Sequence, residues 1–396
     1  MPPLILTEGS AGVCAAGGFL AAGIPAGLKG SGNLDLALIF SERPATAGGV
    51  FTTNRAVAAP VVVSRKHVAS GAARGVVVNS GGANACTGER GLADAHEMAR
   101  TAAGMFGVAE EEFLVCSTGL IGAYLPMDKV LPAIRIAAGS LSPDDEDAAR
   151  AIMTTDTVSK KAAVVHAGGW SVGGIAKGAG MIAPNMATML AFITTDAVVP
   201  SGQLGAALGR AVESSFNSIT VDGDMSTNDT VLLFANGHSG TEPSPEDFAI
   251  ALEAVCSSLA KQIVADGEGA SKFVSVQVRG AASAEEAKKA ARAVADSLLV
   301  KTAVYGQDAN WGRVAGAVGR AGVAVDFARF SIEICGVTLV ERGVPSPPEL
   351  VHAAREAMAA PQISIACDLA SGSARAEMFT TDLTPEYVKL NAEYEL

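Results

Sequence analysis

Residues 177–190 have the sequence Lys177-Gly-Ala-Gly-Met-Ile-Ala-Pro-Asn-Met-Ala-Thr-Met-Leu190, which decides how the rest of the chain is interpreted. The segment places Thr188 directly after Ala187, in a stretch too rich in glycine and proline to be ordinary core. A threonine hydroxyl is a poor nucleophile, but it becomes a good one when its own backbone nitrogen is a free amine that takes the hydroxyl proton. The segment therefore raises the question of whether the chain is cut before Thr188.

We expect an apolar strand over residues 189–193, so that Thr188 stands at the start of a strand. A turn containing Pro184 precedes it and can hold the Thr188 hydroxyl close to the carbonyl of Ala187. Attack there gives an N-to-O acyl shift, and hydrolysis of the ester leaves a new chain that begins at Thr188. Its α-amine has a reference pKa of about 7.7–8.0 and can act as the base for its own hydroxyl. On spacing alone, the alternative is a β-branched residue that merely begins a strand.

The composition is that of a compact protein with a large core. The chain has 396 residues, of which 49% are hydrophobic and 18% charged, and its net charge is -12. This length predicts two or three domains. Because no Lys/Arg cluster offsets the negative balance, a nucleic acid or an anionic membrane surface is not expected as the main partner. A small anionic substrate needs only one local cation and remains compatible.

Cysteine and histidine usage predicts neither a disulfide framework nor a metal site. The six cysteines form no CxxC pair, and the five histidines are equally dispersed. The N-terminal residues show no basic region followed by an apolar run, and no window reaches the roughly 18 uncharged apolar residues of a membrane span. We therefore expect a cytoplasmic enzyme or binding protein.

Short Val/Ile-rich runs alternate with Ala-rich amphipathic segments, which predicts a mixed α/β (α+β) fold. Ser142-Pro143-Asp144 is a helix start signal, so a helix is predicted over 142–153. The other predicted helices cover 91–104, 201–216, 244–267 and 283–298. The predicted strands cover 75–79, 113–115, 163–166, 171–175, 230–234, 273–278, 332–334 and 363–365. No repeat or linker marks a domain boundary.

The segment 177–190 closely resembles the self-processing signature of the ornithine acetyltransferase family, also called the glutamate N-acetyltransferase or ArgJ family. Further segments resemble the same family in the same order, and together they extend over nearly the whole chain. They are Asn79-Ser-Gly-Gly-Ala-Asn-Ala-Cys-Thr-Gly88, Cys116-Ser-Thr-Gly-Leu-Ile-Gly122, Asp222-Gly-Asp-Met-Ser-Thr-Asn-Asp-Thr230, Asp266-Gly-Glu-Gly-Ala270, Lys301-Thr-Ala-Val-Tyr-Gly-Gln-Asp-Ala-Asn-Trp-Gly-Arg313 and Tyr387-Val-Lys-Leu-Asn391. The set is specific, whereas any one segment alone would be weak.

The resemblance implies a DmpA/ArgJ-like self-processing fold in which two chains form one protomer. Cleavage between Ala187 and Thr188 would give an N-terminal alpha chain, residues 1–187, and a C-terminal beta chain, residues 188–396. Family members assemble further into heterotetramers of two alpha and two beta chains.

The implied reaction is a two-step acyl transfer of the cyclic arginine pathway. Thr188 takes the acetyl group from N2-acetyl-L-ornithine and releases ornithine, and L-glutamate then accepts the acetyl group to give N-acetylglutamate. No cofactor is implied. The resemblance leaves open whether acetyl-CoA also serves as a donor substrate.

The implied oxyanion donors are Thr118 and Gly119, because each half-reaction passes through a tetrahedral oxyanion. Without the resemblance, these residues are better interpreted as a turn after the strand at 113–115.

The implied substrate contacts include a cation and an anion. Lys177 suits a substrate carboxylate, and Glu268 suits an ammonium group or a proton near the nucleophile. A solvated lysine and a loop carboxylate are the alternatives for these two, and the choice of Thr155 over its neighbour Thr154 is open. The residues that match the family's substrate ligands are Thr155, Lys177, Thr188, Glu268 and Asn391.

The end of the chain departs from the family pattern. Members commonly finish Asn-x-x-Tyr-x-Thr, and here Asn391 and Tyr394 are followed by Leu396 as the last residue. A side-chain hydroxyl is missing there, so the assignment of Leu396 as a substrate ligand is open, and so is the substrate preference.

The segment beginning at Asp222 has a competing interpretation as a calcium loop. Its oxygen-bearing side chains alternate, but the calcium template also requires Gly at position six and Glu at position twelve. Those positions hold Thr227 and Leu233, so the template fails. The resemblance suggests a hydrogen-bonded turn near the active site instead.

Two further functions remain besides the acetyltransferase. One is a related N-terminal-nucleophile hydrolase, similar to an aminopeptidase, in which water replaces glutamate as the acceptor. The other is a small-molecule binding protein that keeps the fold without processing. The intact set of candidate catalytic residues disfavours the binding protein, which would not require them.

Overall fold

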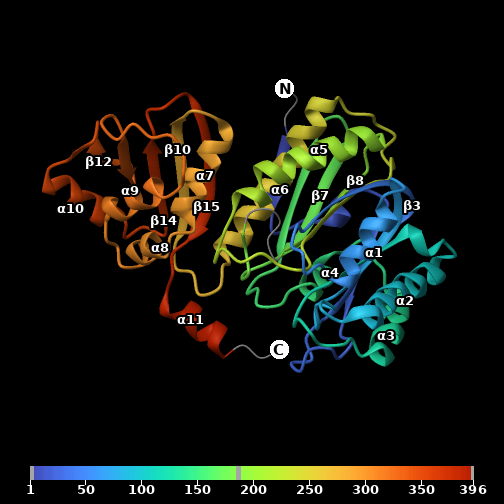
Figure 1. Ribbon diagram of the computed structural model, residues 1–396. Helices are drawn as coiled ribbons and strands as arrows, with labels where there is room; N and C mark the ends of the chain where they lie inside the picture. Colours follow the sequence, from blue (N-terminus) through green and yellow to red (C-terminus); the bar gives the residue numbers. More distant parts are fainter. Residues whose placement is uncertain (1–3, 184–188, 394–396) are drawn as a thin grey trace. The chain divides into compact units, whose positions relative to one another are not determined.

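The computed structural model describes residues 4–183 and 189–393, which form two compact units (Figure 1). The first unit comprises the described residues up to Asn217 together with Asp224–Ile263. The second comprises Ser218–Gly223 and residues 264–393. Both units combine a sheet with helices, so the predicted mixed α/β class is confirmed.

The first unit is built on a nine-stranded sheet with the order β1-β6-β7-β8-β9-β3-β4-β5, in which β2 pairs with β3. Neighbouring strands are antiparallel except for the parallel pairs β4–β5 and β8–β9. The strands are β1 (Leu4–Glu8), β2 (Phe19–Ile24), β3 (Leu36–Phe51), β4 (Ala72–Asn79), β5 (Phe113–Ser117), β6 (Lys160–His166), β7 (Trp170–Lys177), β8 (Leu190–Thr195) and β9 (Thr230–Ala235).

The centre of this sheet is buried on both faces. Every residue of β7, β8 and β9 is buried, and these strands have the near-continuous apolar character of strands covered on both sides. The predicted strands at 163–166 and 171–175 are confirmed as the antiparallel hairpin β6–β7, and the strand predicted at 189–193 is confirmed as β8.

The helices of the first unit include the two predicted at 91–104 and 201–216, and two others, at 59–68 and 127–139, that were not predicted. They are α1 (Ala59–Val68), α2 (Gly88–Phe106), α3 (Met127–Gly139), α4 (Glu146–Ala151) and α5 (Ser201–Ser214). The helix predicted over 142–153 was wrong at its start, because α4 begins only at Glu146. The backbone of Ser142 is instead bonded to β2: its N–H donates to the Ala21 carbonyl at 3.0 Å, and its carbonyl accepts from the Ala21 N–H at 2.9 Å.

The long helix α6 (Pro245–Ala265) is a core helix. Among the described residues it is the one helix long and apolar enough to cross a membrane, but 56% of its most apolar window is buried. The Phe248 ring lies 6.3 Å from the Trp170 ring of β7, measured between centroids. A Cβ built on Gly174 of β7 would lie 3.0 Å from Leu259, so this strand and α6 pack closely. Its apolar residues are therefore covered by the protein itself.

The second unit has a six-stranded sheet with the order β13-β12-β11-β14-β10-β15. In β10 buried Val274, Val276 and Val278 alternate with more exposed residues, and α7 packs on the buried face. The strands are β10 (Phe273–Ala281), β11 (Ser331–Ile334), β12 (Val337–Glu341), β13 (Val344–Pro345), β14 (Gln362–Asp368) and β15 (Ala374–Thr381). The helices are α7 (Ala284–Ala295), α8 (Leu298–Tyr305), α9 (Trp311–Gly319), α10 (Pro348–Ala357) and α11 (Pro385–Ala392).

The predicted cleavage point lies inside the first unit, in the connection between β7 and β8. This point does not coincide with the boundary between the two compact units. The fragments 1–187 and 188–396 are therefore not the two structural units, and cleavage into these fragments stays a prediction. Lys177 pairs with Leu190 in the antiparallel register of β7 and β8. The sheet therefore joins residues on both sides of the predicted cut by backbone hydrogen bonds.

Candidate active site

The site is built around the last residue of β7 and the first residues after the β7–β8 connection. Ala187 and Thr188, the predicted cleavage residues, lie outside the described residues, as does Leu396. Met189, the residue bonded to Thr188, is described and fully buried. The surroundings of Lys177 and Met189 therefore define the site.

Lys177 is a buried cation with two hydroxyl partners. It is 2% exposed, and its Nζ donates to Thr154 Oγ1 at 2.7 Å and to Thr118 Oγ1 at 3.3 Å. The alternative of a solvated lysine is thus wrong. The structure brings together Lys177 and Thr118, two residues predicted for different roles.

Asp156 anchors the loop that presents Thr154. Its carboxylate accepts from Lys160 Nζ at 2.7 Å and from the backbone N–H groups of Gly178 and Thr154 at 2.6 and 2.9 Å. Burial alone would raise the pKa of Asp156, but the charges of Lys177 and Lys160 and the Gly178 amide outweigh it and lower the pKa to about 2. The carboxylate is ionised at neutral pH and holds the loop beside Lys177. Asp156 was not among the site residues predicted from the sequence.

Thr154 and Thr155 lie in different surroundings. Both are half-buried in one loop, but Thr154 accepts a hydrogen bond from Lys177 Nζ. The assignment of Thr155 as a substrate ligand remains a prediction, and Thr154 is the threonine that the structure places on the Lys177 cation.

Thr118 and Gly119 form a tight turn at the end of β5. Thr118 is 3% exposed, and its N–H donates to the Asn79 carbonyl at 2.9 Å. Gly119 has φ +127°, and a Cβ there would lie 2.7 Å from the backbone nitrogen of Gly82. Only glycine fits this position. The turn expected after the strand at 113–115 is therefore present, and its backbone is fixed by close neighbours.

A second turn, residues 226–230, connects this strand end to the β7–β8 connection. Asn228 Nδ2 donates to the carbonyls of Ser117 and Ala83 at 2.8 and 2.6 Å. Asp229 Oδ1 accepts from the Met189 N–H at 2.9 Å. The segment is a hydrogen-bonded turn, as the family resemblance suggested, but no role was predicted for Asn228 or Asp229.

Asp229 is a buried carboxyl, and one of its two oxygens accepts no hydrogen bond from the residues that the structure describes. The residue is 0% exposed, and its Oδ2 has no hydrogen-bond partner among the described residues. Burial raises the pKa of Asp229 well above its ordinary value, and the Met189 amide and the Lys177 charge only partly oppose this effect.

In the second unit, the structure brings together Glu268 and Asn391. Asn391 Nδ2 donates to Glu268 Oε2 at 2.8 Å. The turn that carries Glu268 lies against the start of α11, since a Cβ on Gly269 would be 2.4 Å from the Tyr387 nitrogen. These two predicted substrate ligands are thus direct neighbours.

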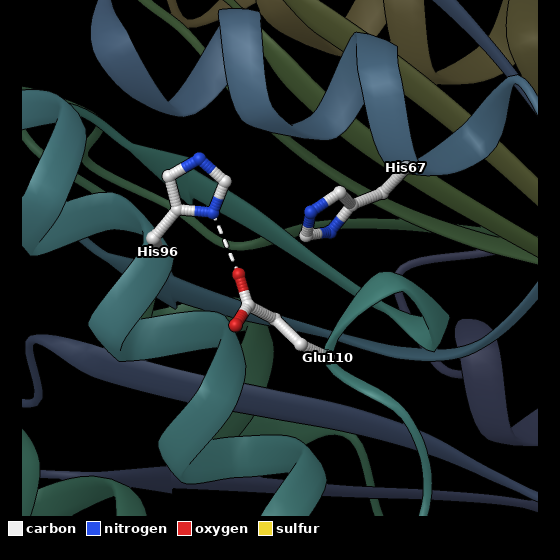
Figure 2. A group of neighbouring side chains, drawn as sticks. All are labelled: His67, His96 and Glu110. Carbon is white, nitrogen blue, oxygen red and sulfur yellow. Dashed lines mark hydrogen bonds and ion pairs between the residues drawn. The ribbon is translucent and has the colours of Figure 1, made fainter.

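One group of side chains among the described residues has the donor set of a metal site: His67, His96 and Glu110 (Figure 2). His67 Nδ1 lies 2.8 Å from the Phe113 carbonyl, and His96 Nδ1 lies 2.6 Å from Glu110 Oε1. The other carboxylate oxygen accepts from Arg100 Nε at 3.0 Å. Burial would raise the pKa of Glu110, but His96 and Arg100 lower it. Because these side chains already partner the carboxylate, we interpret the group as a polar network and assign no metal to it.

The arrangement in the first unit suits acyl chemistry. A buried ammonium group lies next to a hydroxyl and beside the connection that carries a candidate nucleophile. Such a cation can bind a carboxylate, while a hydroxyl and a backbone N–H aimed at one point can stabilise an oxyanion.

Known proteins related to this chain match it over nearly its full length. Residues 20–396 match the ArgJ family. The chain is 50% identical over 394 residues to the arginine biosynthesis bifunctional protein ArgJ of Mycolicibacterium paratuberculosis, covering 97% of this chain and 96% of that protein. It is 48% identical over 389 residues to the protein of the same name from Geobacter sulfurreducens, covering 95% of this chain and 98% of that protein.

Solved structures match over shorter spans. An ornithine acetyltransferase from Mycobacterium tuberculosis, complexed with ornithine, is 46% identical and has a TM-score of 0.45, covering 46% of this chain and 98% of that chain. An arginine biosynthesis bifunctional protein from Bacillus halodurans is 40% identical with a TM-score of 0.48, covering 51% of this chain and 98% of that chain.

Proposed function

The chain belongs to the ArgJ family, and from this membership we propose that it moves an acetyl group from N2-acetyl-L-ornithine to L-glutamate through an ester on Thr188. It is an acyltransferase of arginine biosynthesis. The observation that carries the proposal is the contact of buried Lys177 with Thr118, because it combines a carboxylate-binding cation with an oxyanion donor.

The first step is self-cleavage. The Thr188 hydroxyl attacks the Ala187 carbonyl, the peptide C–N bond breaks as the ester forms, and the nitrogen gains the proton that the hydroxyl loses. Water then hydrolyses the ester to give the fragments 1–187 and 188–396. Support comes from the pairing of β7 with β8, which keeps residues on both sides of the cut in one sheet.

Acetyl transfer follows the same chemistry twice. The free α-amine of Thr188 takes the hydroxyl proton as the oxygen attacks the acetyl carbonyl, and the C–N bond to ornithine breaks with the proton passing to the leaving amine. The glutamate amine then attacks the acetyl ester and restores the hydroxyl. The Thr118 hydroxyl and the Gly119 N–H stabilise each oxyanion, and the loss of one such donor typically costs about 2.7–4 kcal/mol of barrier.

The amino-acid substrates share an α-carboxylate, for which Lys177 is the partner. Glu268, held by Asn391, is the partner of the substrate ammonium group. Thr155 and the terminal residue Leu396 complete the proposed set of ligands together with Thr188.

The relatives are named bifunctional, and we include acetyl-CoA as a second donor in the proposal. The two fragments form one protomer, two protomers form a heterotetramer, and the enzyme works in the cytoplasm without a cofactor.

A single set of assays tests the proposal against its alternatives. The purified protein is supplied with N-acetylornithine or acetyl-CoA as donor, and with glutamate or water as acceptor. We expect ornithine release beyond one equivalent per enzyme to depend on glutamate, and N-acetylglutamate to form from both donors. Ornithine release that is independent of glutamate, with free acetate as product, would indicate the aminopeptidase-like hydrolase. Binding without turnover would indicate the non-catalytic protein.

A further inference from the structure

We propose that the turn 226–230 is a clamp that sets the spacing between the nucleophile and the oxyanion donors, with Asp229 and Asn228 as its positioning residues. The inference rests on the function proposed above for Thr188, Thr118 and Gly119. It concerns residues that are themselves neither nucleophile nor oxyanion donor.

Each side chain of the clamp holds a backbone group one residue away from a reacting residue. Asp229 Oδ1 accepts from the N–H of Met189, which is bonded to Thr188. Asn228 Nδ2 donates to the carbonyl of Ser117, which is bonded to Thr118. Two adjacent side chains therefore connect the two strands, β8 and β5, whose ends carry the proposed chemistry.

The turn is itself held on several sides. The backbone of Asp229 accepts from the Thr52 N–H at 2.9 Å, and that of Thr227 accepts from the Ala58 N–H at 3.0 Å. The Thr52 hydroxyl donates to the Ser226 carbonyl at 2.8 Å. All five residues of the turn are buried. A clamp with this many fixed backbone groups can transmit a defined spacing, and a misplacement of about 1 Å can cost on the order of 100-fold in rate.

Met189 is held at both of its peptide groups. Its N–H meets Asp229 Oδ1, and its carbonyl accepts from the Thr230 N–H at 3.2 Å. The strand pairing of β8 with β9 begins directly afterwards, with Leu190 opposite Thr230. The bond from Met189 to Asp229 therefore fixes the backbone one residue before the β8–β9 pairing begins, on the side of Thr188.

An amide of the same size can replace the Asp229 carboxyl in this bond, because Asp229 acts on Met189 as a hydrogen-bond acceptor. Burial raises the pKa of Asp229, and the carboxamide of asparagine keeps one acceptor oxygen for the Met189 N–H. Asparagine should therefore reproduce the clamp, whereas alanine should not.

The test follows cleavage of the full-length chain over time after cell-free synthesis, by gel and intact mass. We expect Asp229→Ala to slow cleavage about 100-fold and Asp229→Asn to stay within about 10-fold of the unaltered chain. Asp196→Ala is the matched control. Asp196 follows the other end of β8, is buried, and accepts the N–H groups of Ser171 and Gly17 at 2.7 and 3.0 Å. The Asp196→Ala chain should cleave at the rate of the unaltered chain.

Three results would overturn the clamp: unchanged cleavage in Asp229→Ala, equal slowing in Asp229→Asn, or equal slowing in the Asp196→Ala control. Equal slowing in Asp229→Asn would indicate that Asp229 carries a proton. Equal slowing in Asp196→Ala would indicate that the loss of any buried carboxylate destabilises the fold. If the unaltered chain itself does not cleave, the function proposed for Thr188 fails, which is a distinguishable outcome.

Asn228→Asp keeps the proposal testable if Asp229→Ala does not fold. It removes the donor to Ser117 without changing the side-chain size. We expect kcat for acetyl transfer to fall about 10-fold with KM nearly unchanged, because a spacing defect acts on the transition state. An unchanged kcat, or a change in KM alone, would contradict the clamp.

Discussion

Lys177 Nζ donates a hydrogen bond to Thr118 Oγ1 at 3.3 Å, from the end of β7 to the end of β5. The bond links a proposed substrate-binding cation to a proposed oxyanion donor. In the sheet order, four strands separate β7 from β5: β8, β9, β3 and β4. The loops at the ends of these strands, rather than strand pairing, must therefore bring the two side chains together.

Replacement of Lys177 by methionine should lower kcat/KM by about 10–100-fold, because a hydrogen bond to a charged group is worth about 1.5–3 kcal/mol. Steady-state acetyl transfer from N-acetylornithine to glutamate measures the effect. Lys161→Met, which removes another buried ammonium group in the same sheet, is the control and should leave KM unchanged in the folded fraction. Equal losses in both variants would argue against a role for Lys177 in substrate binding.

Thr118→Val keeps the shape of the side chain but removes its hydroxyl. We expect kcat to fall about 100–1000-fold, as for loss of one oxyanion donor, and Thr118→Ser to recover most of the activity. Both variants are compared under saturating substrate. A valine variant with normal kcat would show that the oxyanion is stabilised elsewhere.

Gly119→Ala should disrupt the same turn through the backbone. At φ +127° a Cβ would lie 2.7 Å from the Gly82 nitrogen, so the Gly119 N–H must move. We expect loss of both cleavage and transfer. Gly122→Ala is the matched control, since Gly122 also has positive φ, +90°, but no atom within 4 Å of the added Cβ. A normal rate of cleavage in Gly119→Ala would remove Gly119 from the site.

The ion pair of Asp156 with Lys160 predicts a dependence of stability on pH. The pKa of Asp156 is lowered from 3.8 to about 2 in the folded state, so its stabilisation is complete above pH 3.8 and is lost as the pH falls toward 2. The contribution is on the order of 2 kcal/mol. Urea unfolding should show that Asp156→Asn is less stable than the unaltered chain at pH 7, with a smaller difference at pH 3.

The control for this measurement is Asp147→Asn. Asp147 belongs to an exposed pair with Arg150 at 3.9 Å, so its loss should change the free energy of unfolding by less than about 0.5 kcal/mol at either pH. A difference for Asp156→Asn that stays constant between pH 7 and pH 3 would contradict the proposed ionisation.

Much of the fold could be predicted from periodicity, and the exceptions have local causes. The apolar runs at 75–79 and 189–193 and the amphipathic helix α2 follow simple patterns. Strand β3 was missed because Ser41-Glu-Arg-Pro44 interrupts its apolar sequence, and the structure accommodates these residues as an irregularity between Phe40 and Ala45. Helix α3 was missed because it contains Pro132, which ordinarily ends a helix.

Some residues of the site could likewise be predicted from the sequence, and others could not. Family resemblance supplied Thr118, Gly119 and Lys177, whose motifs are contiguous in sequence. Asp156 and Asp229 depend on partners brought together by folding, and nothing in their local sequence indicates that the pKa of Asp156 is lowered and that of Asp229 raised. The two pKa values differ because Asp229 is fully buried, whereas the charges of Lys177 and Lys160 outweigh burial at Asp156, and only the tertiary structure reveals these surroundings.

The central claim is that Thr188 becomes a chain terminus and then carries the acetyl group. Intact mass spectrometry of the purified full-length protein, before and after addition of N-acetylornithine without glutamate, tests it most directly. We predict two fragments, 1–187 and 188–396, the second of which gains one acetyl group that glutamate removes; Thr188→Ala should remain a single unacetylated chain. A single uncleaved chain in the unaltered protein, or acetylation that survives in Thr188→Ala, would contradict the account.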